Sequence, residues 1–305
     1  MNRLTFLEFD HYRYLKIASL LMVISILVYL FDQPETGAYG GTLLGYFFGI
    51  LSAIIAVAQV VYGIRKRLTP ILAERRKLSG ISPTQTDRRT HKTGWGKLQG
   101  VPLQGWLSAH VYFGLSLLVL ATLHTGFQFG WDIHTFAYVL MVAVIIIGFY
   151  GIHAYLRFPR MMTDNMGGMD TLDTLLIKIE DLDKLASIMS LQFSDDICAI
   201  VLKSRQKTLI GGNFFRQLTA YQRDCPTASA VRKLHMLGKG LKGDQLKSFN
   251  DLYSILVHKD TLVTRARLHV RFKALLEFWQ YLHAPLSIAF LTALVAHIIA
   301  IFYYW

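Results

Sequence analysis

The stretch Trp106–Phe129 reads WLSAHVYFGLSLLVLATLHTGFQF and carries His110 and His124 fourteen positions apart in an otherwise apolar run. Fourteen helical residues turn through about 1400°, which is about 40° short of four full turns. Both histidines of such a helix therefore lie on one side of it, about 21 Å apart along the axis. This stretch predicts a membrane-spanning helix that presents imidazoles at two levels.

A second apolar run, Leu276–Trp305, repeats the spacing with His283 and His297. Histidines inside a membrane span are costly unless they have a partner, and such residues usually mark a functional site. Two helices with matched pairs have the arrangement needed to clamp two haems. The open alternative is that these imidazoles bond to neighbouring helices or line a polar cavity.

The composition places the chain among integral membrane proteins. It has 305 residues, of which 53% are hydrophobic, and its mean hydropathy is +0.36. The apolar residues gather in blocks long enough to cross lipid, which predicts an all-α membrane protein with a five-span helical bundle. The expected spans are Tyr14–Phe31, Leu43–Ile64, Trp106–Phe129, Ile133–Tyr155 and Leu276–Trp305.

The positive charge is concentrated beside the spans. The formal net charge is +12, and the loop 65–104 is strongly basic, whereas the connections 32–41 and 130–132 hold no Lys or Arg. Positive loops mark the cytoplasmic side, so topology explains the charge and no nucleic-acid partner is expected. We expect a multi-pass protein of a bacterial inner membrane, with a cytoplasmic amino terminus and a periplasmic carboxyl terminus.

Polarity changes divide the chain into three parts. Residues 1–155 hold spans one to four, residues 156–274 form an inserted domain, and residues 275–305 form the fifth span. The insert should be a small, mainly α cytoplasmic domain. Short strands at Ile197–Leu202 and Thr208–Ile210 would make it α+β. Helices are expected at Asp170–Leu191, Ala228–Leu237, Asp244–Val257 and Thr261–Trp279.

The order of the spans predicts which histidines pair. Spans three and five have one span between them, so they run in the same direction. His110 and His283 would then hold a haem b iron near the cytoplasmic face, and His124 and His297 a second one near the outer face. Two imidazoles occupy both axial positions of an iron, which favours electron transfer over chemistry at the metal.

Other polar side chains are weaker candidates for contact with a cofactor. His134, at the outer end of span four, is expected to contact a haem propionate or a quinone head group, or to be a simple interfacial histidine. Lys97, Arg271 and Lys273 are candidates for the inner propionates, with solvated boundary charges as the alternative.

Two glycines lie near the histidines of the third span. Gly114 and Gly126 would let a bulky macrocycle approach the helix closely, and ordinary helix packing explains them nearly as well.

The repeated His-x13-His pattern, as His110/His124 and His283/His297, resembles dihaem b-type cytochromes. Such cores occur in respiratory cytochrome bc complexes and in the membrane domains of ferric reductases and NADPH oxidases. The resemblance covers the helical core and implies two non-covalent haems b that carry electrons between the membrane faces. The sequence departs from the ferric reductase pattern because it has no sixth span and no flavin and nicotinamide module.

Together these features predict transmembrane electron transfer through two bis-histidine haems b. The chain would act as an electron-transfer (oxidoreductase) subunit, rather than as a self-contained catalyst, that exchanges electrons with a quinone or with separate redox proteins. One alternative is a membrane protein that transports or binds a metal ion or haem. Another is a membrane scaffold or sensor whose inserted domain recruits partners.

Overall fold

The chain forms two compact units. The spanning unit consists of Met1–Phe149 with Leu282–Trp305, and the intervening unit consists of Tyr150–Tyr281. In the part of the chain that the structure describes, 88% of the residues are helical and none forms a strand. The computed structural model describes residues 6–32, 39–78, 102–166, 171–219, 225–238 and 242–303, with the backbone alone described for 69–78.

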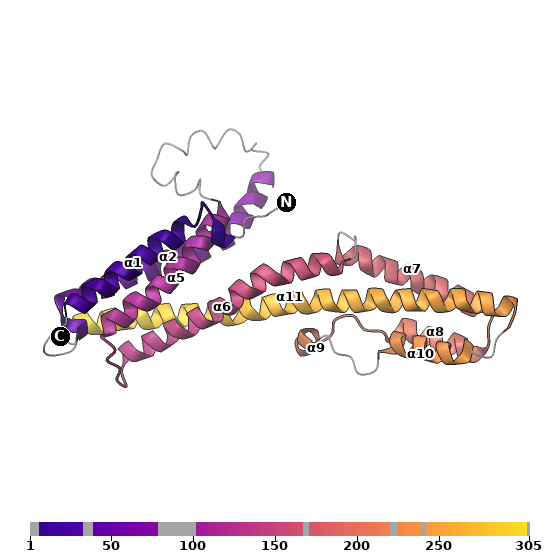
Figure 1. The fold of residues 1–305 in the computed structure, drawn as a ribbon. Helices are drawn as coiled ribbons and strands as arrows, with labels where there is room; N and C mark the ends of the chain where they lie inside the picture. Colours follow the sequence, from indigo (N-terminus) through magenta and orange to yellow (C-terminus); the bar gives the residue numbers. More distant parts are fainter. Residues whose placement is uncertain are drawn as a thin grey trace. The chain divides into compact units, whose positions relative to one another are not determined.

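Among the described residues, five helices are long and apolar enough to cross a membrane, which indicates a multi-pass membrane protein (Figure 1). This confirms the all-α, five-helix prediction. Helices α6 and α11 extend well beyond their apolar parts, so each contributes residues to both units. The five are α1 (Arg13–Phe31), α2 (Leu43–Leu78), α5 (Leu103–Thr125), α6 (Ile133–Asn165) and α11 (Asp244–Tyr303).

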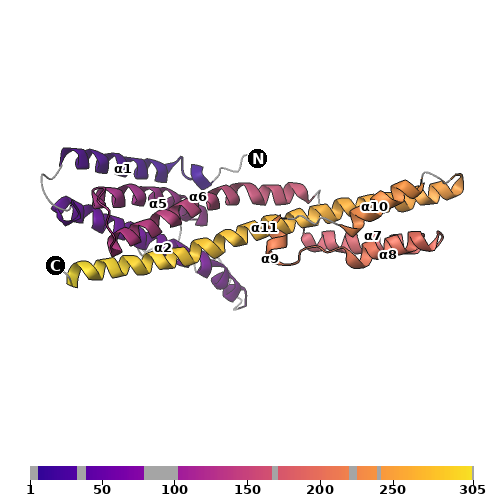
Figure 2. The ribbon, with the colours of Figure 1, turned by 90° about the horizontal axis from the view of Figure 1, so that it is seen from below.

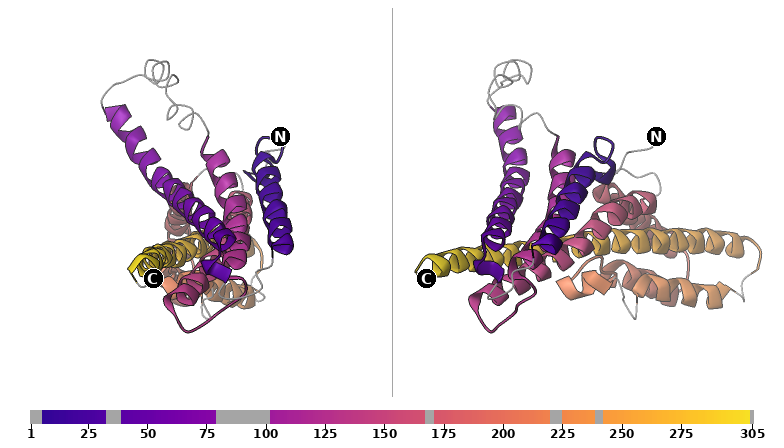
Figure 3. Two further views of the ribbon diagram at one scale, coloured as in Figure 1. Left: turned by 90° about the vertical axis from the view of Figure 1, so that its left-hand side faces the viewer. Right: turned by 60° about the vertical axis from the view of Figure 1, so that its left-hand side comes forward.

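Within the spanning unit, α5 lies between α1 and α2 and packs against both (Figure 3). Its core joins α2, α5, α6 and α11 through Phe48, Leu120, Met141 and Phe290. Large apolar side chains also point outward: Ile50, Ile54, Ile146 and Ile288 are each 60–62% exposed. An apolar core combined with an apolar surface is what a bundle surrounded by lipid requires.

Two short 3₁₀ helices contact α5. The 3₁₀ helix η1 (Phe6–Glu8) is tied to α5 because the Tyr112 hydroxyl donates to the Leu7 carbonyl at 3.0 Å. At its other end, α5 stops at Gly126, whose φ of 57° is the left-handed conformation that favours glycine. A second 3₁₀ helix, η2 (Tyr39–Gly41), leads into α2.

The intervening unit is a small helical domain. Helices α7 (Leu172–Ser190) and α8 (Asp195–Lys207) lie side by side (Figure 2), and α10 (Pro226–Leu237) packs on α8. The short α9 (Phe214–Thr219) lies between α8 and α10 in the sequence. Side chains from α7, α8, α10 and α11 share one core, which includes Ala186, Val201, Leu234, Leu252 and Leu256.

The expected strands of this unit were wrong. Ile197–Leu202 lies inside α8, and Thr208–Ile210 lies beyond its end in irregular structure. Two acidic residues occupy the first turn of α8, where negative charge is favoured by the helix dipole. Ile197 and Val201, one turn apart, are both buried on the same face. A short run rich in β-branched residues is therefore one buried stripe of an amphipathic helix.

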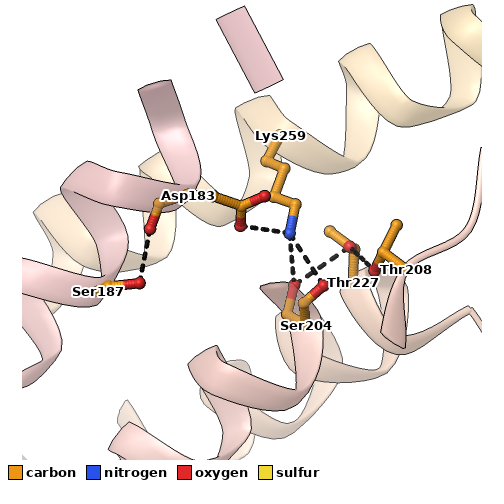
Figure 4. Close-up of polar contacts among 6 residues, drawn as sticks. All are labelled: Asp183, Ser187, Ser204, Thr208, Thr227 and Lys259. Carbon is orange, nitrogen blue, oxygen red and sulfur yellow. Dashed lines mark hydrogen bonds and ion pairs between the residues drawn. The ribbon is translucent and has the colours of Figure 1, made fainter. Parts of the chain in front are cut away.

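A buried lysine ties the helices of the intervening unit together (Figure 4). The Lys259 side chain of α11 is fully buried. Its ammonium lies 2.5 Å from Oδ1 of Asp183, on α7, and 3.0 Å from both the carbonyl and the hydroxyl oxygen of Ser204, on α8. The Ser204 hydroxyl in turn donates to Thr227 Oγ1, on α10, at 3.1 Å. All three ammonium hydrogens therefore have acceptors, as a buried charge requires.

Candidate paired-histidine site

The four histidines of the apolar runs come together in two pairs. The ring centres of His110 and His283 are 6.4 Å apart, and those of His124 and His297 are 6.1 Å apart. In both pairs one ring comes from α5 and the other from α11. The two helices therefore run in the same direction, with imidazoles facing each other at two levels.

The distances suit two imidazoles on opposite sides of one metal ion. A metal lies about 2.0–2.1 Å from an imidazole nitrogen and the ring centre is about 1.1 Å further on, so opposed ring centres are about 6.3 Å apart. In the described residues no group of three or more His, Cys, Asp or Glu is placed to hold a metal ion. A haem iron takes four ligands from its porphyrin, so a pair of imidazoles is a full protein set.

At the outer level, α2 orients His124. Nδ1 of His124 lies 2.7 Å from the carbonyl oxygen of Gly45. A carbonyl only accepts, so Nδ1 carries the proton and Nε2 keeps its lone pair. Metal-binding histidines characteristically donate their second nitrogen in this way. Gly49, one turn further along α2, lies directly against the same ring.

The partner ring at the outer level, His297, is bonded to a third imidazole. Its Nδ1 is hydrogen-bonded to Nδ1 of His134, on α6, and the ring centres are 4.4 Å apart. His134 is exposed and is the second residue of α6. The preceding Asp132 accepts the backbone N–H of Thr135 at 2.8 Å, and this bond holds the pKa of Asp132 below its usual value. A propionate or quinone contact of His134 stays a prediction.

At the inner level, α2 and α6 flank the rings. The ring of Tyr62, on α2, is centred 4.7 Å from that of His110. Nδ1 of His110 is buried and has no hydrogen-bond partner among the described residues, so this nitrogen is available to a ligand. His283 is hydrogen-bonded to the backbone of Val144, on α6. A Cβ at Gly148, one turn on, would make an ordinary contact of 3.7 Å with His283 Cε1.

Two cations at the end of span two were missed as site residues. The charge of Lys66 acts on both His110 and His283. The guanidinium carbon of Arg65 lies 4.9 Å from the centre of the Trp106 ring. Both basic side chains are half-buried. The sequence does contain a signal for Lys66, because it follows Tyr62 by one helical turn. The positive-inside rule already explains the run of basic residues, so this signal does not stand out.

Two of the three cations that were expected to bind propionates belong to the intervening unit. Lys97 lies outside the described residues. Arg271 donates to the Leu218 carbonyl at 3.0 Å, and Lys273 lies 4.0 Å from Glu277, all within the intervening unit. Their contact with a propionate stays a prediction.

The glycines that touch the imidazoles are also different from those expected. Gly114 has only the Gln59 amide near its open side, and Gly126 ends α5 beside Tyr39. The contacts are instead made by residues on other helices or segments. They are Gly40 and Gly49 beside His124, and Gly148 beside His283.

The same four helices, α2, α5, α6 and α11, supply residues at both levels. Comparison of the chain with protein-family models, with curated protein sequences and with solved structures gives no match. The geometry of the two imidazole pairs therefore carries the functional argument.

Proposed function

We propose that this chain binds two haems b in its spanning unit and transfers electrons between the two faces of a membrane. The observation that carries the proposal is the spacing of the rings. The ring centres of His110 and His283 are 6.4 Å apart, and those of His124 and His297 are 6.1 Å apart. Two imidazoles that held one metal ion between them would have ring centres about 6.3 Å apart.

The residues around the pairs support this assignment. His124 has one nitrogen committed to the Gly45 carbonyl and the other left with a lone pair. His110 has a buried nitrogen without a hydrogen-bond partner among the described residues, which is costly in lipid unless a ligand takes it. Lys66 supplies positive charge at the inner pair, where a propionate would be held.

When bound, a bis-imidazole haem b supplies a one-electron ferric/ferrous couple with no open coordination position. The backbone of Gly45 beside His124 and that of Val144 beside His283 would hold the ligands in position and orientation. The two levels are about 21 Å apart along α5, so one lies near each boundary of a hydrocarbon core of about 30 Å. This suits a conduit that accepts electrons at one face and releases them at the other.

The proposal includes an orientation and a setting. The basic residues 65–67 at the end of span two favour a cytoplasmic position for that end by the positive-inside rule. The amino terminus and the intervening unit would then be cytoplasmic and the carboxyl terminus periplasmic, in a bacterial inner membrane. As a subunit, the chain would exchange electrons with a quinone or with separate redox proteins, as its resemblance to dihaem b-type cytochromes implies.

Absorption spectroscopy tests the proposal directly. Protein purified from haem-replete cells should show a reduced b-type α-band and two haems per chain. Replacement of any one of the four paired histidines by Ala should reduce the content to one haem. The matched control is His153→Ala, because His153 is an exposed histidine of α6 in the intervening unit. A colourless wild-type preparation would rule out the function.

A metal-ion path is the second candidate. The contact of a third imidazole, His134, with His297 favours it at the outer level. Such a path predicts exchangeable, substoichiometric metal and no low-spin haem spectrum, so the same preparation distinguishes the two functions. A scaffold or sensor function predicts instead that His283→Ala leaves the function of the protein unchanged.

A further inference from the structure

We propose that His134 is the positioning residue of His297: its imidazole accepts the Nδ1 proton of His297 and thereby fixes the ring that faces His124. This inference rests on the proposed function and adds a residue to it. The observation that carries it is the hydrogen bond between the two Nδ1 atoms, which joins α6 to α11 across 163 positions of sequence.

Only one direction of this hydrogen bond allows His297 to bind a metal ion. One of the two Nδ1 atoms carries the proton and the other accepts it. If His134 donates, His297 carries its proton on Nε2 and has no lone pair there for a metal. If His297 donates, its Nε2 is free, as Nε2 of His124 is through the bond to Gly45. A metal-binding His297 therefore requires His134 as the acceptor.

The start of α6 holds His134 in place. Asp132 caps the helix through its carboxylate bond to the Thr135 N–H, and its carbonyl accepts the Phe136 N–H at 3.0 Å. His134 is the second residue of the helix and lies between Asp132 and the two residues whose N–H groups Asp132 binds. The ring planes of His134 and His297 are perpendicular, so the edge of one imidazole meets the face or edge of the other without stacking.

The two histidines of the outer level are therefore oriented by different kinds of hydrogen-bond partner. His124 donates to the backbone carbonyl of Gly45, which no substitution at position 45 removes. His297 depends on a side chain, which substitution at position 134 does remove. Loss of such a supporting partner typically weakens metal binding about 10–100-fold. The effect should be confined to the outer pair, because His134 bonds to His297 whereas His110 and His283 face each other in the separate inner pair.

Three variants of the full-length protein test the role of the acceptor. His134→Phe keeps a ring but removes the acceptor, His134→Gln restores an acceptor oxygen, and His134→Lys offers only donors. Each is compared with wild type by haem titration of the apoprotein, by the low-spin electron paramagnetic resonance signal and by redox titration. His153→Phe, on the same helix, is the matched control.

We expect His134→Phe and His134→Lys to bind one of the two haems about 10–100-fold more weakly, with an altered low-spin signal and a more positive potential for that haem. His134→Gln should move all three measurements back toward wild type, and the second haem should be unchanged throughout. Wild-type values in His134→Phe, or equal loss in His134→Phe and His134→Gln, would overturn the positioning role. A wild-type chain that binds no haem would instead remove the proposed function, and the inference with it.

Discussion

Gly49 lies so close to His124 that a Cβ added at Gly49 would stand 2.8 Å from Cε1 and 2.9 Å from Nδ1 of the imidazole. Real Cβ atoms essentially never approach a neighbour so closely, so Gly49→Ala must displace the ring from the Gly45 carbonyl and from His297. We predict that Gly49→Ala binds one haem per chain instead of two, as measured by the haem-to-protein ratio.

The control for this variant lies on the same helix. A Cβ at Gly63 would meet nothing within 4 Å, so Gly63→Ala should keep two haems. Alanine also has the higher helix propensity, by about 1 kcal/mol, so neither substitution should weaken α2 itself. Two haems with an unchanged low-spin signal in Gly49→Ala would contradict the tight contact.

The inner level should tolerate the same substitution. A Cβ at Gly148 would lie 3.7 Å from Cε1 of His283, which is an ordinary van der Waals distance. We predict that Gly148→Ala retains both haems and both low-spin signals. Loss of a haem in this variant would show that the inner pair is packed more tightly than its contacts indicate.

Lys66 should tune the potential of the inner centre. A charge about 10 Å away contributes on the order of 1–2 kcal/mol at an effective dielectric constant of about 20. A nearby cation favours the less positive ferrous state, so Lys66→Gln should lower the potential of one haem by several tens of millivolts. Lys16→Gln, at an exposed lysine of α1, is the control. Redox titration would count against this role if both variants matched wild type.

The buried ion pair of the intervening unit should be sensitive to loss of one partner. Lys259→Met leaves the Asp183 carboxylate without its counter-ion, which typically costs about 3–5 kcal/mol. We predict a lower midpoint of thermal unfolding in detergent. The double variant Asp183→Asn with Lys259→Met leaves no charge behind and should recover part of the loss.

An exposed pair serves as the control. Lys184 and Glu180 lie 2.9 Å apart on α7, with side chains 55% and 65% exposed. Solvent screens such a surface pair and it contributes little to stability, so Lys184→Met should leave the midpoint nearly unchanged. If the double variant is no more stable than Lys259→Met alone, lost packing rather than the unpaired Asp183 charge causes the loss of stability.

Regular spacing made much of the spanning unit predictable. The fourteen-residue interval placed two histidines on one face of a helix, and the order of the spans indicated which rings lie at the same level. Both relations depend only on helix geometry and topology. The contact of His134 with His297 depends instead on how α6 is rotated and placed, which no interval within one helix encodes.

The intervening unit was harder to predict for a related reason. The run Ile197–Leu202 has the composition of a strand, and only its packing against α7, α10 and α11 shows that it forms one buried face of α8. Lys259 and Asp183 are 76 positions apart, and nothing local marks either as buried. Such long-range polar contacts are set by tertiary packing.

The division of each pair between α5 and α11 also determines when a pair can form. His110 and His124 belong to the third apolar run of the sequence, and their partners His283 and His297 follow only with the fifth. Neither pair can therefore form before α11 has been made. A slip of α11 by one turn, about 5.4 Å, would separate both couples at once, whereas a substitution at a single ring disturbs one level only.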